Sequence, residues 1–343
     1  MRKVLILSSL LFLIFSIKAT ISVTSLKTEG MTNPLGIDVE HPRFSWKSEA
    51  TIEQNVMQKA YQILVASTSE KLANNDADVW NSGKVNSDKQ LWIPYGGSEL
   101  KSNQQFFWKV KIWTNKGESA WSEIAMWSMG ILNEVEWRSA QWIGLDKAMP
   151  WDDESYYSRL SVRYVRKEFP VKKEIRRATV HITGLGIYEL FINGNRVGDQ
   201  VLAPAPTDFN KTVFYNTYDV TSLLRKGGNA VGIALGNGRY YTMRQTYKPW
   251  KSPTYGYPKT RMMLIMEYTD GTSETVATRE NWKLNADGPV RSNNEYNGEE
   301  YDARKELNRW TEVSYDDSKW ENAQRVRFPE GKVRAQIMPG MRV

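Results

Sequence analysis

Short runs in which apolar and polar residues alternate make up most of the chain, and Gly, Asn, Asp and Pro separate these runs. Alternation with a period of two is typical of half-buried β-strands, and few segments show the helical period. In residues 188–199, YELFINGNRVGD, apolar side chains recur at Tyr188, Leu190 and Ile192. The dipeptide Asn193-Gly194 tolerates the positive φ angles of a two-residue hairpin turn. The pattern therefore predicts an all-β fold, with a β-hairpin at this point.

A first β-sandwich is predicted over residues 21–135. Its main strand candidates are residues 42–47, 60–67, 78–85, 106–114 and 125–130. In the fourth of these, Trp108, Val110 and Ile112 form an apolar face, whereas the opposite face is mixed. Three features resemble the fibronectin type III module. They are an early strand with a tryptophan, a Y-x-I-x-V strand and a late W-K-V-x-I-W hairpin. That module is a seven-stranded sandwich of about 100 residues.

A second, larger β-sandwich is predicted over residues 136–343. The run 260–278 has the pattern of a hairpin with Asp270-Gly271 at its tip. One face of the first strand of this hairpin is apolar, at Met262, Leu264, Met266 and Tyr268. The density of such strand candidates is typical of a jelly-roll sandwich.

The first 20 residues have the layout of a secretory signal peptide. Arg2 and Lys3 precede an uncharged apolar run from Val4 to Ile17, and Ala19 supplies a small residue near a cleavage site. A membrane span is the alternative, but it needs ~20 apolar residues, so the shorter run favours cleavage. We therefore expect export, to the periplasm or the medium of a bacterium. No membrane span is expected after cleavage, because no other long apolar run occurs.

The composition excludes several kinds of chemistry. The chain has no cysteine, which excludes thiol catalysis, zinc–thiolate sites and a lipid-modified N-terminal cysteine. We expect its two histidines, His41 and His181, to be structural, because they are too few for a multi-histidine metal site and neither context favours a Ser-His-Asp triad. The net charge of +7 is spread along the chain rather than gathered in a basic stripe, so no nucleic-acid partner is expected.

Several motifs, in a fixed order, carry a family resemblance. Residues 184–241, which include GLGIYELFINGNRVGD and LGNGRYY, resemble the N-terminal β-sandwich of bacterial α-L-rhamnosidases, a glycoside hydrolase family. Three further stretches resemble the same family: WRSAQWIG at 137–144, LSVRYVRKEF at 160–169 and residues 293–323. In that family a fibronectin-like module usually precedes them. The hairpin pattern also occurs in sugar-binding sandwiches of β-galactosidase-like hydrolases, but GEEYDAR and DDSKW favour the rhamnosidases. The resemblance covers residues 21–340.

The resemblance implies that the chemistry resides elsewhere. In that family a later all-helical (α/α)₆ barrel supplies a general acid and a base that activates water. The chain ends before such a barrel, so we expect no catalytic residue in it and no hydrolysis by it alone. Two acidic clusters, at 152–154 and at 295–302, remain as an alternative paired-carboxylate site. We favour solvated loops and hydrogen bonds to turns or to Arg304 for these clusters.

Sugar binding needs an aromatic face for the C–H-rich side of a ring, and amides, carboxylates or guanidinium groups for its hydroxyls. Two loop segments supply such residues, and the carbohydrate-binding candidates are Asp208, Asn210, Asn237, Arg239, Tyr240 and Trp250. The resemblance makes bound Ca²⁺ a further expectation, since a related sandwich of the family binds rhamnose through calcium. Turn formation by Asp208 and Asn210, and packing by Tyr240, are the alternatives. The family commonly has tryptophan where Arg239 stands, so a stacking platform is missing there.

Together these patterns predict the exported accessory region of an α-L-rhamnosidase-like glycoside hydrolase that acts on rhamnose-containing glycans. Two alternatives remain open. One is a stand-alone, calcium-dependent carbohydrate-binding protein. The other is the structural half of a split enzyme whose catalytic barrel is encoded separately.

Overall fold

The computed structural model describes residues 21–153, 159–241, 255–294, 298–328 and 330–343. The predicted signal peptide, residues 1–20, lies outside the described residues, as does the sugar-binding candidate Trp250. Strands dominate the described chain, and its one α-helix, α1, spans only Ser69–Ala73, which confirms the predicted all-β class. Within these ranges no helix has the length and apolar character that a membrane span requires.

The chain forms two compact units, of which the first comprises residues 21–32, 43–98 and 107–125. One of its sheets has the order β1-β2-β6, with bounds Ile21–Thr28, Arg43–Ala50 and Ile93–Pro94. In the other sheet, β3 (Gln58–Ala66) pairs with β4 (Trp80–Asn81), β5 (Val85–Asn86) and β7 (Gln105–Thr114), and β7 pairs with β8 (Gly117–Glu118). Trp108, Val110 and Ile112 on β7 are completely buried, so the predicted apolar face is confirmed.

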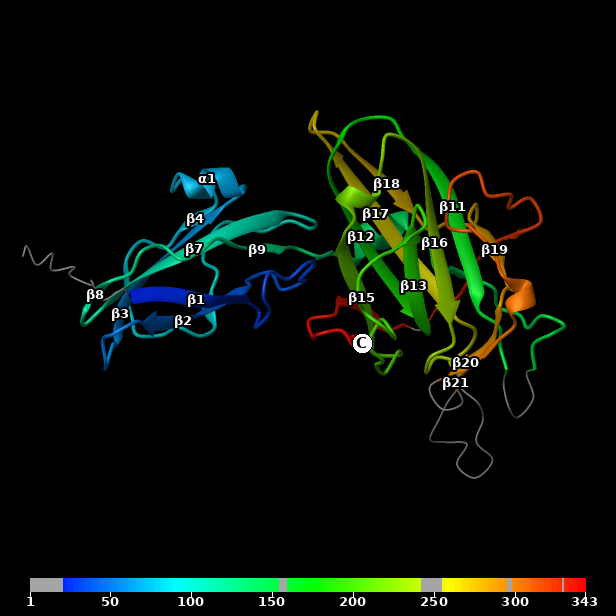
Figure 1. Ribbon diagram of the computed structural model, residues 1–343, viewed down its shortest axis with the longest axis horizontal. Coiled ribbons are helices and arrows are strands. Elements are labelled where there is room, and N and C mark those ends of the chain that lie inside the picture. The colour runs from blue at the N-terminus through cyan, green and yellow to red at the C-terminus, as the bar shows by residue number, and fades with distance from the viewer. Residues whose placement is uncertain (1–20, 154–158, 242–254, 295–297, 329) are drawn as a thin grey trace, which may run out of the picture. The chain divides into compact units, whose positions relative to one another are not determined.

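The second unit is a sandwich of two sheets, and β9 (Ala125–Ser128) leads the chain into it. Successive long strands alternate between the two sheets, as in a jelly roll (Figure 1). One sheet has the order β23-β10-β17-β12-β15-β24 and the other the order β14-β13-β16-β11-β19-β22. The first sheet comprises β10 (Ile143–Gly144), β12 (Ile175–Leu185), β15 (Thr212–Asp219), β17 (Lys259–Tyr268), β23 (Gln324–Arg325) and β24 (Lys332–Ala335), with β18 (Ser273–Ala277) paired to β17. The second comprises β11 (Arg163–Val171), β13 (Ile187–Ile192), β14 (Asn195–Arg196), β16 (Gly227–Gly236), β19 (Lys283–Asn285) and β22 (Glu321–Asn322).

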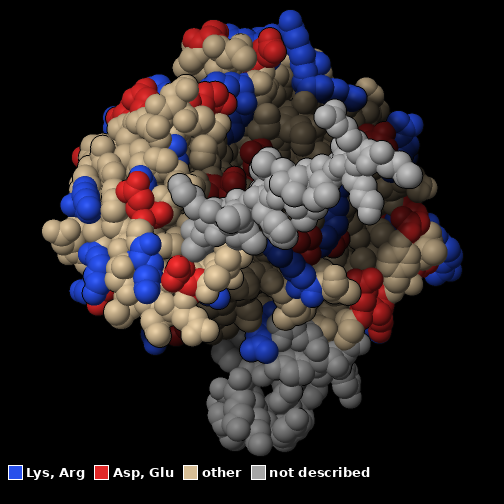
Figure 2. All heavy atoms as spheres, turned by 60° about the vertical axis from the view of Figure 1, so that its left-hand side comes forward, with Lys and Arg blue, Asp and Glu red and all other residues tan. Residues whose placement is uncertain are grey.

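Short elements complete the unit. β20 (Val290–Asn294) and β21 (Gly298–Tyr301) form a separate two-stranded sheet. The described 3₁₀-helices are η1 (Glu134–Ser139), η2 (Thr221–Leu223) and η3 (Ala303–Lys305). On the face drawn in Figure 2, the basic and acidic side chains are interspersed rather than gathered into patches of one sign.

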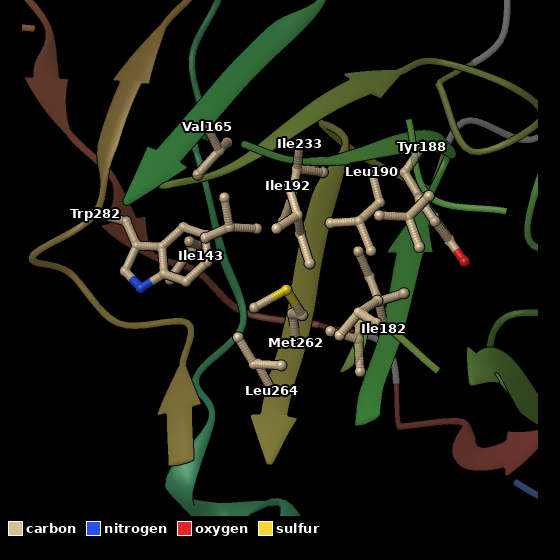
Figure 3. Close-up of a cluster of buried hydrophobic side chains, with 14 of the residues drawn as sticks. Ile143, Val165, Ile182, Tyr188, Leu190, Ile192, Ile233, Met262, Leu264 and Trp282 are labelled. Atoms are coloured by element: carbon tan, nitrogen blue, oxygen red, sulfur yellow. The ribbon is translucent and has the colours of Figure 1, made fainter. Parts of the chain in front are cut away.

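The core lies between the two sheets of the sandwich. Leu190, Ile192 and Ile233 project from one sheet toward Ile182, Met262 and Leu264 of the other (Figure 3). The predicted apolar face of β17 is confirmed, because its four residues all belong to this cluster. The alternate residues Met263 and Ile265 belong to a second cluster on the outer face of the same sheet. β17 is therefore covered on both sides.

The predicted hairpin at 188–199 is confirmed. β13 and β14 pair in antiparallel fashion, and the turn residues Asn193 and Gly194 have φ angles of 49° and 84°. The Asn193 side chain donates to the carbonyl of Leu223 at 2.8 Å and accepts from the backbone N–H of Ala230 at 2.9 Å. Asn193 thus shapes the turn and also ties it to the following strands.

The compact units are not contiguous in sequence. The second unit includes the stretches Asn33–Pro42 and Glu99–Phe106 as well as everything from Met126 onward. Within that unit, the Asp38 carboxylate accepts from the backbone N–H of Ala335 at 3.0 Å. The proposed division of the sequence at residue 135 remains a prediction.

Candidate carbohydrate-binding site

A cleft of about 450 Å³ in the second unit is lined by four aromatic residues together with polar and charged ones. We call it the tyrosine cleft, and its lining residues are Asp146, Asn210, Tyr240, Tyr255, Gly256, Tyr257, Lys259, Arg327 and Phe328. The rings of Tyr240 and Tyr255 are stacked, with centroids 5.7 Å apart and planes inclined by 19°. Phe209 contacts both rings edge-on, at 5.3 Å from Tyr240 and 5.2 Å from Tyr255. This packing fixes the aromatic wall.

Backbone and burial hold Tyr240 in place. The backbone N–H of Tyr255 donates to the carbonyl of Tyr240 at 3.0 Å. Only 1% of Tyr240 is exposed, and burial raises the pKa of its phenol well above the ordinary value. Tyr240 is therefore a neutral, rigid part of the wall at physiological pH.

Polar groups stand beside the aromatic wall. The Lys259 ammonium donates to the Asp146 carboxylate at 3.1 Å and to the Arg327 carbonyl at 2.7 Å. Lys259 is buried, whereas the side chain of Asp146 is 38% exposed. Asn210 adds an exposed amide. The cleft thus offers apolar ring faces together with hydrogen-bond donors and acceptors, the combination that a sugar ring requires.

A second, larger cavity of about 770 Å³ lies at the segment 336–341. We call it the large cavity, and the loop 200–206 forms much of its wall. Arg239, which is exposed, and Glu299 also line it. Its lining is mainly apolar, with Leu202 and Met338 about half exposed.

The predicted sugar-binding residues do not all lie together in the structure. Asn210 and Tyr240 share the tyrosine cleft, and Arg239 lies at the large cavity. The Asp208 carboxylate accepts from the backbone N–H of Asn210 at 3.2 Å, as in a turn. Asn237 is 1% exposed, and its side-chain amide donates to the carbonyl of Leu160 at 2.9 Å. Trp250 lies outside the described residues.

Sequence reasoning missed the other half of the tyrosine cleft. Tyr255 and Tyr257 flank Gly256 in the stretch TYGYPK, and this pair of alternating tyrosines was the available signal. Lys259 follows two residues later, but it lies in an apolar strand whose pattern gives no hint of a binding site. Phe328 comes from a distant part of the chain, where no local pattern connects it with the tyrosines.

Three acidic residues of the two predicted clusters pair with arginines. The Asp152 carboxylate lies 3.0 Å from the Arg163 guanidinium, and both side chains are fully buried. Glu300 pairs with Arg159. Asp302 pairs with Arg304, whose hydrogen bond is the main cause that lowers the pKa of Asp302 to about 2. Among the described residues, no three His, Asp or Glu side chains come together as a metal site would require.

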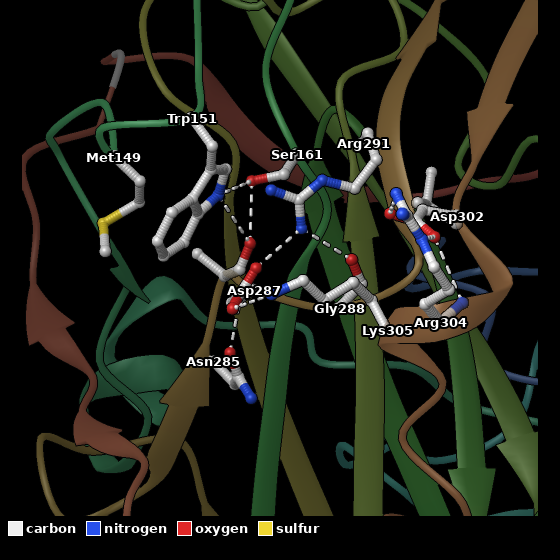
Figure 4. Close-up of polar contacts among 12 residues, drawn as sticks. Met149, Trp151, Ser161, Asn285, Asp287, Gly288, Arg291, Asp302, Arg304 and Lys305 are labelled. Atoms are coloured by element: carbon white, nitrogen blue, oxygen red, sulfur yellow. Dashed lines mark hydrogen bonds and ion pairs between the residues drawn. The ribbon is translucent and has the colours of Figure 1, made fainter.

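Neighbouring side chains form a polar network on one edge of the sandwich (Figure 4). The Trp151 indole N–H donates to the Ser161 hydroxyl and to the Ala286 carbonyl, both at 3.2 Å. Asp287 accepts from Arg291 at 2.9 Å and from Lys305 at 2.8 Å. This network fastens the strand β20 and the turn η3 to the sandwich.

Comparison of the sequence with known protein families finds two matches. Residues 173–343 match the model of the α-L-rhamnosidase N-terminal domain, and residues 23–133 match that of the Rha78A-like, N-terminal immunoglobulin domain. Immunoglobulin and fibronectin type III domains share the sandwich architecture, so the predicted β-sandwich agrees with this match.

Individual relatives are much longer than this chain. An α-L-rhamnosidase of Formosa agariphila is 39% identical over an alignment of 330 positions, which covers 91% of this chain and 34% of that protein. An α-L-rhamnosidase structure from Dictyoglumus thermophilum has a TM-score of 0.83 at 41% identity and covers 93% of this chain and 35% of its own. One from Aspergillus terreus has a TM-score of 0.81 at 29% identity, with coverages of 92% and 35%. This chain thus spans about a third of such relatives, and its residues 173–343 belong to the family of α-L-rhamnosidase N-terminal domains.

Proposed function

We propose that this chain is the exported, non-catalytic N-terminal region of an α-L-rhamnosidase-like glycoside hydrolase, and that it contacts rhamnose-containing glycans. The match to the N-terminal third of named rhamnosidases is the observation that carries the proposal. The engagement of Asp152, Glu300 and Asp302 by arginines supports the non-catalytic role. A general acid for glycoside hydrolysis needs a raised pKa, whereas the pKa of Asp302 is lowered.

The glycan contact is proposed for the tyrosine cleft. Stacked rings beside the Asp146–Lys259 pair support a site for a sugar ring. Calcium dependence is part of this proposal, with Asp146, which also pairs with Lys259, and Asn210 as side-chain oxygen donors in the lining of the cleft. In a full-length protein the region would flank the catalytic domain and hold the polymer near it.

Incubation of the purified chain at high concentration with p-nitrophenyl α-L-rhamnoside tests the proposal. We expect no release of rhamnose over hours, while calorimetry detects binding of an α-linked rhamnose trisaccharide. Tyr257→Ala should weaken binding at the tyrosine cleft about tenfold, whereas Tyr257→Phe, which retains the ring, serves as the matched control. EDTA followed by added Ca²⁺ tests the metal dependence.

Release of rhamnose that survives repurification would overturn the non-catalytic role. If Glu299→Gln or Asp302→Asn abolished this release of rhamnose, these residues would belong to an unrecognised catalytic carboxylate pair. Unchanged trisaccharide affinity in Tyr257→Ala would instead remove the tyrosine cleft from the proposal.

A further inference from the structure

The outer face of the sheet β14-β13-β16-β11-β19 carries a groove of about 550 Å³. We call it the sheet groove, and it is separate in its lining from the tyrosine cleft. Its floor is on β16, where the outward residues Ala234 and Gly236 are small. Small side chains on a central strand, flanked by larger ones on both neighbours, leave a trough along the sheet.

Strand register places unlike groups on opposite sides of this floor. Ala234 pairs with Glu189 of β13 on one side and with Tyr164 of β11 on the other. Because residues in register on neighbouring strands point to the same face, a carboxylate and an aromatic ring stand on either side of Ala234. Glu189 is exposed, and its carboxylate lies 3.2 Å from Arg196.

Aromatic rings form the end wall of the groove. Trp310 stands between Phe191 and Tyr164, with ring centroids 5.9 Å and 5.3 Å away, and it meets both edge-on. The buried Arg166 guanidinium holds the Trp310 segment, since it donates to the carbonyls of Trp310 and Glu312, both at 2.9 Å. The wall is therefore rigid, and Trp310 remains partly exposed.

The charged groups along the groove are carboxylates, which carry negative charge and accept hydrogen bonds. Glu189, Glu299 and Glu306 line it, and the Tyr301 hydroxyl donates to Glu306. Burial raises the pKa of the Tyr164 phenol to about 12, and the nearby charges of Glu299 and Glu306 add to the shift. Within the described lining of the groove there is no lysine or arginine. Arg196 offsets part of the charge of Glu189, and the remaining negative charge of Glu299 and Glu306 disfavours carboxylates and sulfates.

The groove continues into the large cavity. Ile187, Val201, Leu202, Asn293 and Glu299 line both spaces. Each volume falls within the roughly 300–1,000 Å³ that is usual for small-molecule sites. A chain of linked rings, rather than a single ring, therefore suits the combined space. Arg239 lines the large cavity but not the sheet groove, so the selection by charge is argued for the groove.

We propose that the sheet groove is a second glycan site that accepts a neutral oligosaccharide and rejects an acidic one. The rings of Trp310 and Tyr301 provide the apolar faces, and the carboxylates and Asn293 accept hydrogen bonds from hydroxyls. The inference rests on the proposed contact with glycans, and it adds both a surface and a selection by charge.

Calorimetry with two probes tests the inference on the full chain. One probe is an α-linked L-rhamnose trisaccharide, and the other is the same trisaccharide with a terminal glucuronic acid. We expect at least tenfold tighter binding of the neutral probe to this groove. Ala234→Leu, which fills the floor, should remove that binding. The double variant Glu189→Lys, Glu306→Lys should reverse the preference between the probes.

Controls separate this site from the tyrosine cleft. Tyr301 is 53% exposed, so Tyr301→Ala should disturb the fold little. It replaces Ala234→Leu as the test variant if the Ala234→Leu protein does not fold. Tyr301→Phe retains the ring as the matched variant. Measurements in a Tyr257→Ala background isolate the groove.

Neutral binding that persists in Ala234→Leu and Tyr301→Ala but disappears in Tyr257→Ala would overturn the inference and leave the proposed function intact. Equal affinity for the two probes, or no binding in the Tyr257→Ala background, would also overturn it. A hydrolytic activity of the chain would contradict the proposed function without bearing on the groove.

Discussion

At the scale of single residues, His181 illustrates how a polar side chain in a strand becomes structural. The imidazole is completely buried and makes hydrogen bonds to the Thr217 hydroxyl at 2.9 Å and to the Asn103 amide oxygen at 3.1 Å. Burial lowers the pKa of His181 to about 3, and the positive charge of Arg177 contributes to the shift. The histidine is thus neutral in the folded protein, as a structural role requires.

This shift predicts a loss of stability in mild acid. The unfolded chain takes up a proton near pH 6.5, whereas the folded chain resists protonation down to about pH 3. The contribution of His181 is therefore fully present above pH 6.5 and is lost as the pH falls toward 3. Within that window the slope approaches ~1.4 kcal/mol per pH unit.

Urea unfolding of the chain and of His181→Gln at pH 7 and pH 5 measures this effect. Glutamine does not titrate, so the variant should lose less stability between the two pH values, by roughly 2 kcal/mol. An equal loss in both proteins would show that His181 is not the group responsible.

At the scale of elements, Gly232 on β16 shows why a glycine stands in a strand interior. A Cβ atom at this position would lie 2.7 Å from the Trp310 ring and 2.7 Å from the Thr311 methyl group. The absence of a side chain lets the segment that carries Trp310 lie directly on the sheet.

Gly232→Val should therefore push this segment away from the strand. We expect a loss of about 1–3 kcal/mol in the free energy of unfolding, typical of overpacking, and a red-shifted tryptophan emission. Ala234→Val is the matched control, since it points to the same face but toward the open groove. Similar effects of the two changes would contradict the account of Gly232.

Elements governed by local patterns were predictable, whereas elements governed by distant contacts were not. The Asn193-Gly194 turn and the apolar face of β17 follow from neighbouring residues. Trp310 covers Gly232 from 78 positions away in the sequence. A local pattern of apolar and polar residues cannot predict a contact over that separation. The same holds for the tyrosine cleft, where Asn210 and Tyr240 were predicted but Phe328 comes from a remote segment.

At the scale of the whole molecule, the two compact units are interleaved in sequence. Asn103 belongs to the stretch Glu99–Phe106, yet its side chain bonds His181 and its carbonyl accepts from Arg177 of the same unit. Asp38, from the stretch Asn33–Pro42, accepts from the backbone of Ala335. The second sandwich therefore depends on residues that precede it by up to about 100 positions.

A fragment of residues 136–343, cut at the boundary predicted from the sequence, would lack these partners. His181, Arg177 and the Ala335 N–H would each lose a hydrogen bond, at a cost of about 1–3 kcal/mol when the remaining group stays buried. We expect the fragment to unfold at a clearly lower temperature than the same sandwich within residues 21–343, as followed by calorimetry. Asn103→Ala in the longer protein should reproduce part of the loss, because it removes the partner of His181 but leaves the backbone carbonyl that Arg177 uses. If the fragment and the longer protein unfold at the same temperature, the stretches 33–42 and 99–106 contribute nothing to the second sandwich, and its boundary lies where the sequence pattern places it.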